Sequence, residues 1–137
     1  MVLGAACQDI ENCDTNDEWE FMIVRFLDKD TNTAKPVQFT VFANDLTVFV
    51  PDTSYTSLGL ALNPSTESVL FRFDSTGTAI SFEMEIAYET QLSVFDEDCD
   101  PSLSFFNLDT VRYTFDSLAI PTQITNRLVD TNVQVFF

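Results

Sequence analysis

Histidine is absent from the 137 residues of this chain. Its absence removes the commonest general base, the usual partner of a serine or cysteine nucleophile, and the commonest zinc ligand. Basic side chains are also few, because six Lys and Arg stand against 22 Asp and Glu, for a formal net charge of −16. Such a charge repels phosphate groups and anionic lipid headgroups. The composition therefore excludes most familiar active sites and makes nucleic acid an improbable partner.

Long apolar runs are missing as well, so we expect no helix that spans a bilayer. The chain is nevertheless 45% hydrophobic and contains 14 Phe, which is too much apolar mass for a disordered acidic chain. A chain of this length forms one domain and buries about two-thirds of its unfolded surface. We therefore place the acidity on the surface of a single folded core.

Apolar and polar residues alternate along most of the chain from Trp19 onward. The clearest case is the segment 78–89, and the same period of two recurs at 37–41, 46–50, 58–62, 69–73 and 133–137. This period predicts strands that bury one face. In segment 78–89 the predicted buried side chains are Ile80, Phe82, Met84, Ile86 and Tyr88.

Residues 20–27 carry apolar side chains at consecutive positions, which is typical of a central strand in a sheet that is partly covered on each side. Turn-forming residues separate the segments, at 28–32, 44–45, 51–52, 63–65, 74–77, 96–101 and 130–132. Residues 74–77 are the best hairpin turn. The pattern predicts an all-β fold, an antiparallel two-sheet β-sandwich of eight or nine strands, immunoglobulin-like or related.

Small apolar residues precede Cys7, and polar, acidic residues follow it. Small side chains before a processing point suit the cleft of a signal peptidase. The segment 3–7, Leu-Gly-Ala-Ala-Cys, resembles the end of a bacterial lipoprotein signal, in which the cysteine is lipidated. We therefore interpret residues 1–6 as the remnant of a signal segment, residues 7–18 as an acidic tether, and residues 19–137 as one β-sandwich domain. The alternative is a start codon followed by an unstructured apolar tail.

The three cysteines support export, because an odd count in an exported protein implies one thiol with a separate fate. A lipid on Cys7 would leave Cys13 and Cys99 as a pair. In the chain-entropy model, a disulfide closing a loop of that length stabilises by about 4 kcal/mol. A Cys7–Cys13 bridge, and no bridge at all in a reducing compartment, are the competing assignments.

Several short segments together resemble a family of cell-envelope lipoproteins of unknown function from Bacteroidota. They are the apolar end before Cys7, the nearby Cys13, the first strand 23–28, Cys99 with the aromatic segment 103–108, and residues 115–120. The resemblance implies a lipid on Cys7, a disulfide from Cys13 to Cys99, and a sandwich-like β domain facing the periplasm or the outside. It implies no activity.

Oxygen ligands at Asp28, Asp30 and Asn32 are spaced like the start of a calcium loop. Thr33 and Phe39, however, stand where that loop needs Gly and a bidentate Glu. We therefore favour a polar hairpin turn. A second weak candidate for a hard cation is the acidic loop with Asp96, Asp98 and Asp100.

Glu83 and Glu85 lie on one face of the predicted strand, roughly 7 Å apart by strand rise, within the range of paired catalytic carboxylates. Alternation places them on the wet face, where they are expected to stay ionised and to pair with an arginine across strands. Cys99 lacks a histidine that could activate it. No catalytic residue is predicted.

We expect a non-catalytic, lipid-anchored protein of the outer membrane, on its periplasmic or cell-surface face. It would be a binding or assembly module that contacts another envelope protein through a sheet edge or its loops, and that meets the membrane through its lipid alone. The alternative is a calcium-dependent carbohydrate-binding or enzymatic domain that uses the acidic loops. A third possibility is a structural component of the periplasm without lipid. No cofactor is predicted, apart from a weak expectation of calcium.

Overall fold

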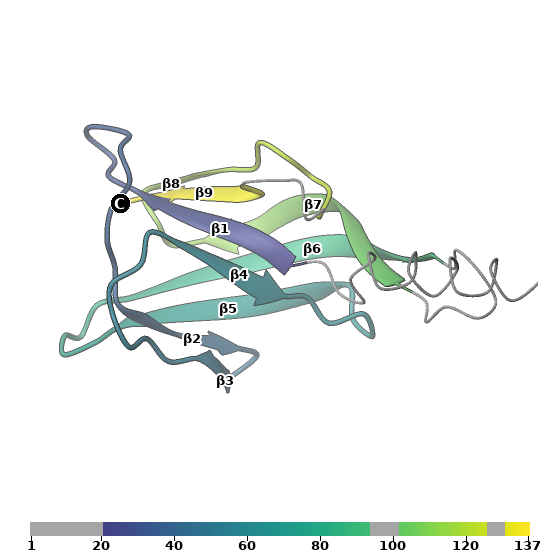
Figure 1. Ribbon diagram of the computed structural model, residues 1–137, viewed down its shortest axis with the longest axis horizontal. Helices are drawn as coiled ribbons and strands as arrows, with labels where there is room; N and C mark the ends of the chain where they lie inside the picture. Colours follow the sequence, from purple (N-terminus) through teal and green to yellow (C-terminus); the bar gives the residue numbers. More distant parts are fainter. Residues whose placement is uncertain (1–20, 94–101, 126–130) are drawn as a thin grey trace, which may run out of the picture.

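The computed structural model describes residues 21–93, 102–125 and 131–137. This part of the chain forms nine strands and no helix (Figure 1). No helix that could cross a membrane is therefore found in the described residues. The strands are β1 (Phe21–Leu27), β2 (Phe39–Ala43), β3 (Leu46–Phe49), β4 (Ser57–Ala61), β5 (Ser68–Ser75), β6 (Ser81–Ser93), β7 (Ser102–Tyr113), β8 (Ser117–Ala119) and β9 (Val133–Phe136).

The strands form two sheets, a four-stranded one in the order β4-β1-β9-β8 and a five-stranded one in the order β3-β2-β5-β6-β7. The predicted all-β sandwich is therefore confirmed. One pairing differs from the expected antiparallel arrangement, because β1 and β9 are parallel, from Val24 beside Val133 to Leu27 beside Phe136. Parallel neighbours need a long crossover connection. Here almost the whole domain lies between the two strands in sequence, so the short turns between neighbouring strands do not indicate that β1 and β9 pair.

The core lies between the sheets and is rich in phenylalanine. Phe26 on β1 has ring neighbours Phe39, Tyr55, Phe73 and Phe137, with centroids 5.5, 5.7, 5.8 and 6.5 Å away. Tilted and edge-to-face pairs of this kind each contribute about 0.5–1.5 kcal/mol beyond the burial of their area. The many phenylalanines are therefore mainly core residues. Burial raises the pKa of the Tyr55 hydroxyl to about 12, although that hydroxyl donates a 2.7 Å hydrogen bond to the carbonyl oxygen of Phe39.

Most of the predicted buried faces are confirmed. Every second residue from 37 to 41 and from 69 to 73 is buried, as are Met84, Ile86 and Tyr88 on β6. The predicted central position of the first strand is also confirmed, since β1 lies between β4 and β9. The predicted turn at 74–77 overlaps the connection 76–80 between β5 and β6, although residues 74 and 75 belong to β5. Gly77 in this connection adopts a φ of 78°, a left-handed conformation that glycine adopts without strain.

Two predicted buried faces are wrong. Ile80 is 55% exposed because it precedes β6, within the connection that closes the β5–β6 hairpin. The alternating residues Leu46, Val48 and Val50 are all exposed. β3 is the outermost strand of the five-stranded sheet, and its register with β2 shifts between Val41 and Phe42. The shift places Phe49 opposite the buried Val41, so Phe49 packs against the core while the alternating residues 46, 48 and 50 stay exposed.

The opposite edge of the same sheet, β7, is covered by the segment 122–125. The backbone N–H of Leu108 donates to the carbonyl oxygen of Gln123, and the N–H of Thr125 donates to that of Phe105. The buried side chain of Asn132 holds this segment in place, since its Nδ2 donates to the carbonyl oxygens of Thr122 and Ile124. Covering an edge in this way prevents another chain from pairing with it.

Candidate functional site

In the turn that was a weak candidate for calcium binding, the carboxylate of Asp28 accepts hydrogen bonds from the backbone of the turn itself. Oδ1 of Asp28 accepts hydrogen bonds from the N–H groups of Asp30 and Thr31, at 2.8 and 3.2 Å. These two bonds hold the pKa of Asp28 below its usual value. A bridge between Leu27 and Ala34 closes the segment as a hairpin, which confirms the predicted polar turn.

No group of three or more Cys, Asp or Glu side chains that could hold a metal ion occurs in the described residues. The other candidate cation ligands, Asp96, Asp98 and Asp100, lie outside the described residues. The same is true of the predicted lipidation site Cys7 and of the predicted disulfide partners Cys13 and Cys99. These assignments therefore stay predictions.

Glu83 and Glu85 lie on β6 on the side of the sheet away from the core. Glu85 forms a salt bridge with Arg112 of β7, with Nε and Oε1 3.0 Å apart. This confirms the expected pairing of one of these acids with an arginine on a neighbouring strand. The pair thus belongs to a charged outer face.

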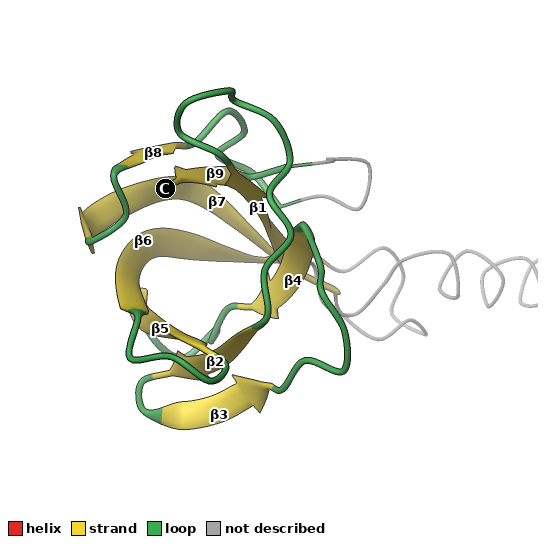
Figure 2. Ribbon diagram, turned by 90° about the vertical axis from the view of Figure 1, so that its left-hand side faces the viewer, coloured by secondary structure: helices red, strands yellow, loops and turns green. Residues whose placement is uncertain are grey.

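The least expected surface is the exposed apolar pair Leu46 and Val48 on β3. Leu46 is the register partner of Ala43, and Ala43 packs against the core. Directly opposed residues point to the same face of a sheet, so Leu46 also points to the core side. It is nevertheless 73% exposed, and Val48 is 51% exposed. Figure 2 shows why, because β3 lies at the extreme of the domain beyond β2, with β4 to one side.

An apolar groove of about 300 Å³ lies between β3 and the end of β4. Leu46 and Val48 form one wall, and no charged side chain lines it. Ala61, Leu62, Pro64 and Val69 also line the groove. Leu62 and Val69 are buried, so the floor of the groove is continuous with the core. Exposed apolar surface of this kind marks interaction sites in folded proteins.

The β2–β3 hairpin holds this surface in a fixed place. Its turn residues Asn44 and Asp45 have φ angles of 48° and 68°, as a two-residue hairpin turn of the primed type requires. The N–H of Asn44 donates to the carbonyl oxygen of Leu70, and the N–H of Leu70 donates to Oδ1 of Asn44, at 2.9 and 3.2 Å. The groove wall is thereby tied to β5.

Charged side chains strengthen the same connection. Arg72 of β5 lies 4.2 Å from the ring centroid of Phe42 and forms ion pairs with Asp45 and Asp74 at 3.1 and 3.2 Å. A guanidinium that stacks on an aromatic ring while pairing with carboxylates has little freedom to move. The β2–β3 hairpin is therefore attached to β5 through backbone and side chains alike.

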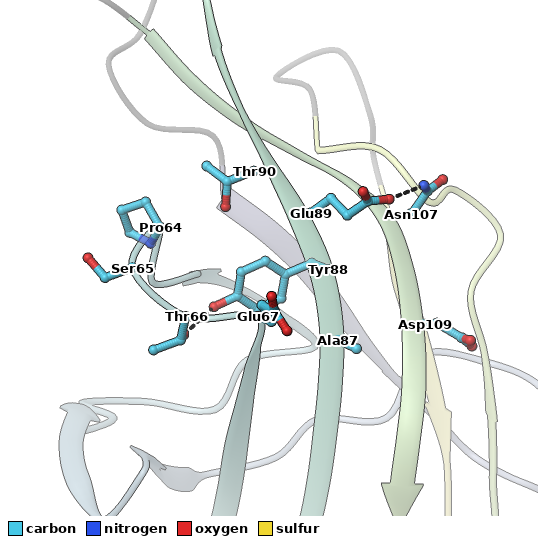
Figure 3. Close-up of a pocket in the computed structure, with 10 residues that line it drawn as sticks. All are labelled: Pro64, Ser65, Thr66, Glu67, Ala87, Tyr88, Glu89, Thr90, Asn107 and Asp109. Carbon is cyan, nitrogen blue, oxygen red and sulfur yellow. Dashed lines mark hydrogen bonds between the residues drawn. The ribbon is translucent and has the colours of Figure 1, made fainter.

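A second concavity, an acidic hollow of about 790 Å³, lies on the outer face of the five-stranded sheet (Figure 3). Its lining includes the carboxylates of Glu67, Glu89 and Asp109 and no basic side chain, with Ala87 between them. Asn107, whose φ is 54°, donates from Nδ2 to Oε2 of Glu89. The register between β6 and β7 shifts close to this point, which opens the sheet surface here.

The turn between β4 and β5 separates the groove from the hollow. The hydroxyl of Tyr88 donates to the carbonyl oxygen of Asn63 at 2.7 Å and lies 2.9 Å from Oγ1 of Thr66. Burial raises the pKa of this hydroxyl above its ordinary value. Pro64 lines both concavities. An apolar groove and an acidic hollow therefore lie on the two sides of one fixed turn.

Comparison with known proteins adds nothing to this geometry, because no protein-family model, curated protein or solved structure matches the chain. The sequence pattern did not indicate most of this candidate site. Leu46 and Val48 were expected in the core, and Glu67 and Asp109 carried no expectation. The sequence feature that could have indicated the exposure of Leu46 and Val48 is the position of segment 46–50 directly after a two-residue turn.

Proposed function

We propose that this chain is a non-catalytic, lipid-anchored envelope protein that acts as a binding or assembly module for another envelope protein. The observation that carries the proposal is the exposure of Leu46 and Val48 on β3, where both line an apolar groove. Leaving such side chains in water costs about 1.5–3 kcal/mol each relative to full burial. A partner that covers them recovers the share of this free energy that corresponds to their exposed fractions, 73% for Leu46 and 51% for Val48.

The arrangement of the acidic side chains supports binding over catalysis. The chain has no histidine, Asp28 is held by its own turn, and Glu85 is paired with Arg112. A general acid would need a carboxyl group in an apolar pocket, whereas the groove is lined by no charged side chain. Its apolar lining suits the burial of a partner's side chains.

The place of the protein in the cell is proposed from the sequence. A lipid on Cys7 and a disulfide between Cys13 and Cys99 would make it an outer-membrane lipoprotein, on the periplasmic or cell-surface face. The apolar stretch before Cys7 and the odd cysteine count support this placement. The chain would then meet the membrane through its lipid while its acidic surface stays in water.

Purification from the native membrane tests both parts of the proposal. We expect a partner protein to copurify with the wild type and with Val111→Lys, and to be lost from Val48→Lys. Val111 is a matched control because it is 57% exposed on β7, at the opposite edge of the sheet. Retention of the partner by Val48→Lys would refute the assigned surface. In the same sample, an unlipidated Cys7 with free thiols at Cys13 and Cys99 would refute the anchor.

A further inference from the structure

We infer that the groove accepts an extended segment of the partner, whose apolar side chains cover Leu46 and Val48 and whose neighbouring Lys or Arg enters the acidic hollow. The inference rests on the proposed function and deepens it, because it names the chemistry of the segment that is bound. It follows from the free strand edges, from the position of Pro64 and from the charges around the hollow.

An extended conformation follows from the two strands that border the groove. β3 and β4 each end their sheet, so each has one side that pairs with no other described strand. The main-chain N–H and C=O groups of a free strand edge are satisfied by an extended chain. A segment of four or five residues, as long as β3 and β4, would span roughly 15 Å at the usual strand rise.

The opposite edge of the five-stranded sheet, at β7, is covered by a segment of this chain. There the segment 122–125 supplies hydrogen bonds to Phe105 and Leu108, and Thr125 is buried. On the β3 side, the described residues place no comparable segment over Leu46 and Val48. In the inferred complex, a segment of the partner takes the position on the β3 side that 122–125 takes on β7.

The charges around the hollow indicate which side chains the bound segment carries. Three carboxylates line the hollow without a basic side chain, on the other side of Pro64 from the groove. A segment that leaves the groove across Pro64 therefore meets Glu67 first and Asp109 beyond it. Lys or Arg at that position is attracted, and an acidic residue is repelled. A second copy of this chain is disfavoured because each copy carries a formal net charge of −16.

Selection from a random dodecapeptide display library on the purified full-length chain tests this inference. We expect enriched peptides to combine alternating apolar residues with Lys or Arg at one end. Their affinity should fall about tenfold or more for Val48→Lys and for Leu46→Lys, and it should stay unchanged for Val111→Lys. Both mutated β3 side chains are already exposed, so melting temperatures close to that of the wild type would confirm that the variants fold.

The double variant Glu67→Gln with Asp109→Asn tests the hollow separately. It should remove the preference for the basic end and flatten the dependence of affinity on salt, because both carboxylates are exposed and screened by ions. No enrichment, or enriched peptides without a basic end, would overturn the inference. If binding of the native partner still depends on Val48, the proposed function stands although the inference about the bound segment fails. If the partner and the peptides are both indifferent to Val48→Lys, both proposals fail.

Discussion

Replacing Asn132 by alanine is expected to destabilise the domain strongly, because this fully buried side chain joins three parts of the chain. Its Oδ1 accepts from the N–H of Ile23 on β1 at 3.0 Å. Its Nδ2 donates to the carbonyl oxygens of Thr122 and Ile124 at 3.1 and 2.8 Å. Alanine leaves one backbone donor and two backbone acceptors without these partners.

The magnitude follows from the cost of an unsatisfied buried polar group, about 1–3 kcal/mol each. Water can reach part of the vacated space, so we expect a loss of about 3 kcal/mol in the free energy of unfolding. For a domain of this size, about 4 °C of melting temperature correspond to 1 kcal/mol, which predicts a decrease of about 12 °C. Asn132→Asp should cost at least as much, because it keeps the acceptor but directs a carboxylate at two carbonyl oxygens.

Urea unfolding followed by circular dichroism measures this loss directly. Gln134→Ala is the matched control, because Gln134 lies two residues further along in β9, is only partly buried and should change stability by about 0.5 kcal/mol or less. Equal midpoints for Asn132→Ala and Gln134→Ala would refute the argument that Asn132 fastens the segment 122–125 to β1.

Three further perturbations test other parts of the structure. Because burial raises the pKa of Tyr55 from 10.0 to about 12, the unfolded state loses this proton first as pH rises. The stability associated with Tyr55 should therefore be complete below pH 10 and fall between pH 10 and 12, and Tyr55→Phe should lessen the decline in alkaline urea titrations. Gly77→Ala should cost about 1 kcal/mol by calorimetry, because its φ is 78° while a new Cβ has no neighbour within 4 Å. Millimolar calcium should leave the melting temperature unchanged relative to sodium of equal ionic strength, and an increase would favour a calcium-dependent function instead.

The alternation of apolar residues predicted the sandwich well because burial of one face is a local property of a strand. Val69, Phe71 and Phe73 lie in the core as their spacing indicates. The same spacing failed at Leu46 and Val48, since exposure there depends on which strand is outermost and on the register shift that turns Phe49 to the core. That information resides in long-range pairing, including the parallel contact of β1 with β9.

Long-range side-chain contacts and the candidate site were less predictable than the strands for the same reason. Asn132 was expected in a turn, yet its side chain bonds to Ile23, 109 positions away in sequence. Pro64 was expected in a turn and lies in one, but no local pattern shows that this turn separates an apolar groove from an acidic hollow. The polar turn expected at 28–32, by contrast, was predicted correctly, because Asp28 bonds to residues two and three positions away.

The most direct test of the proposed binding surface is site-specific photo-cross-linking in native cells, with a photoreactive phenylalanine analogue at position 48 and a control at position 111. We predict a cross-link to one envelope protein from position 48, absent from position 111. Mass spectrometry should place that link within an extended, apolar segment next to Lys or Arg. Equal cross-linking from both positions, or none from position 48, would contradict the assignment of the β3 side as the binding surface.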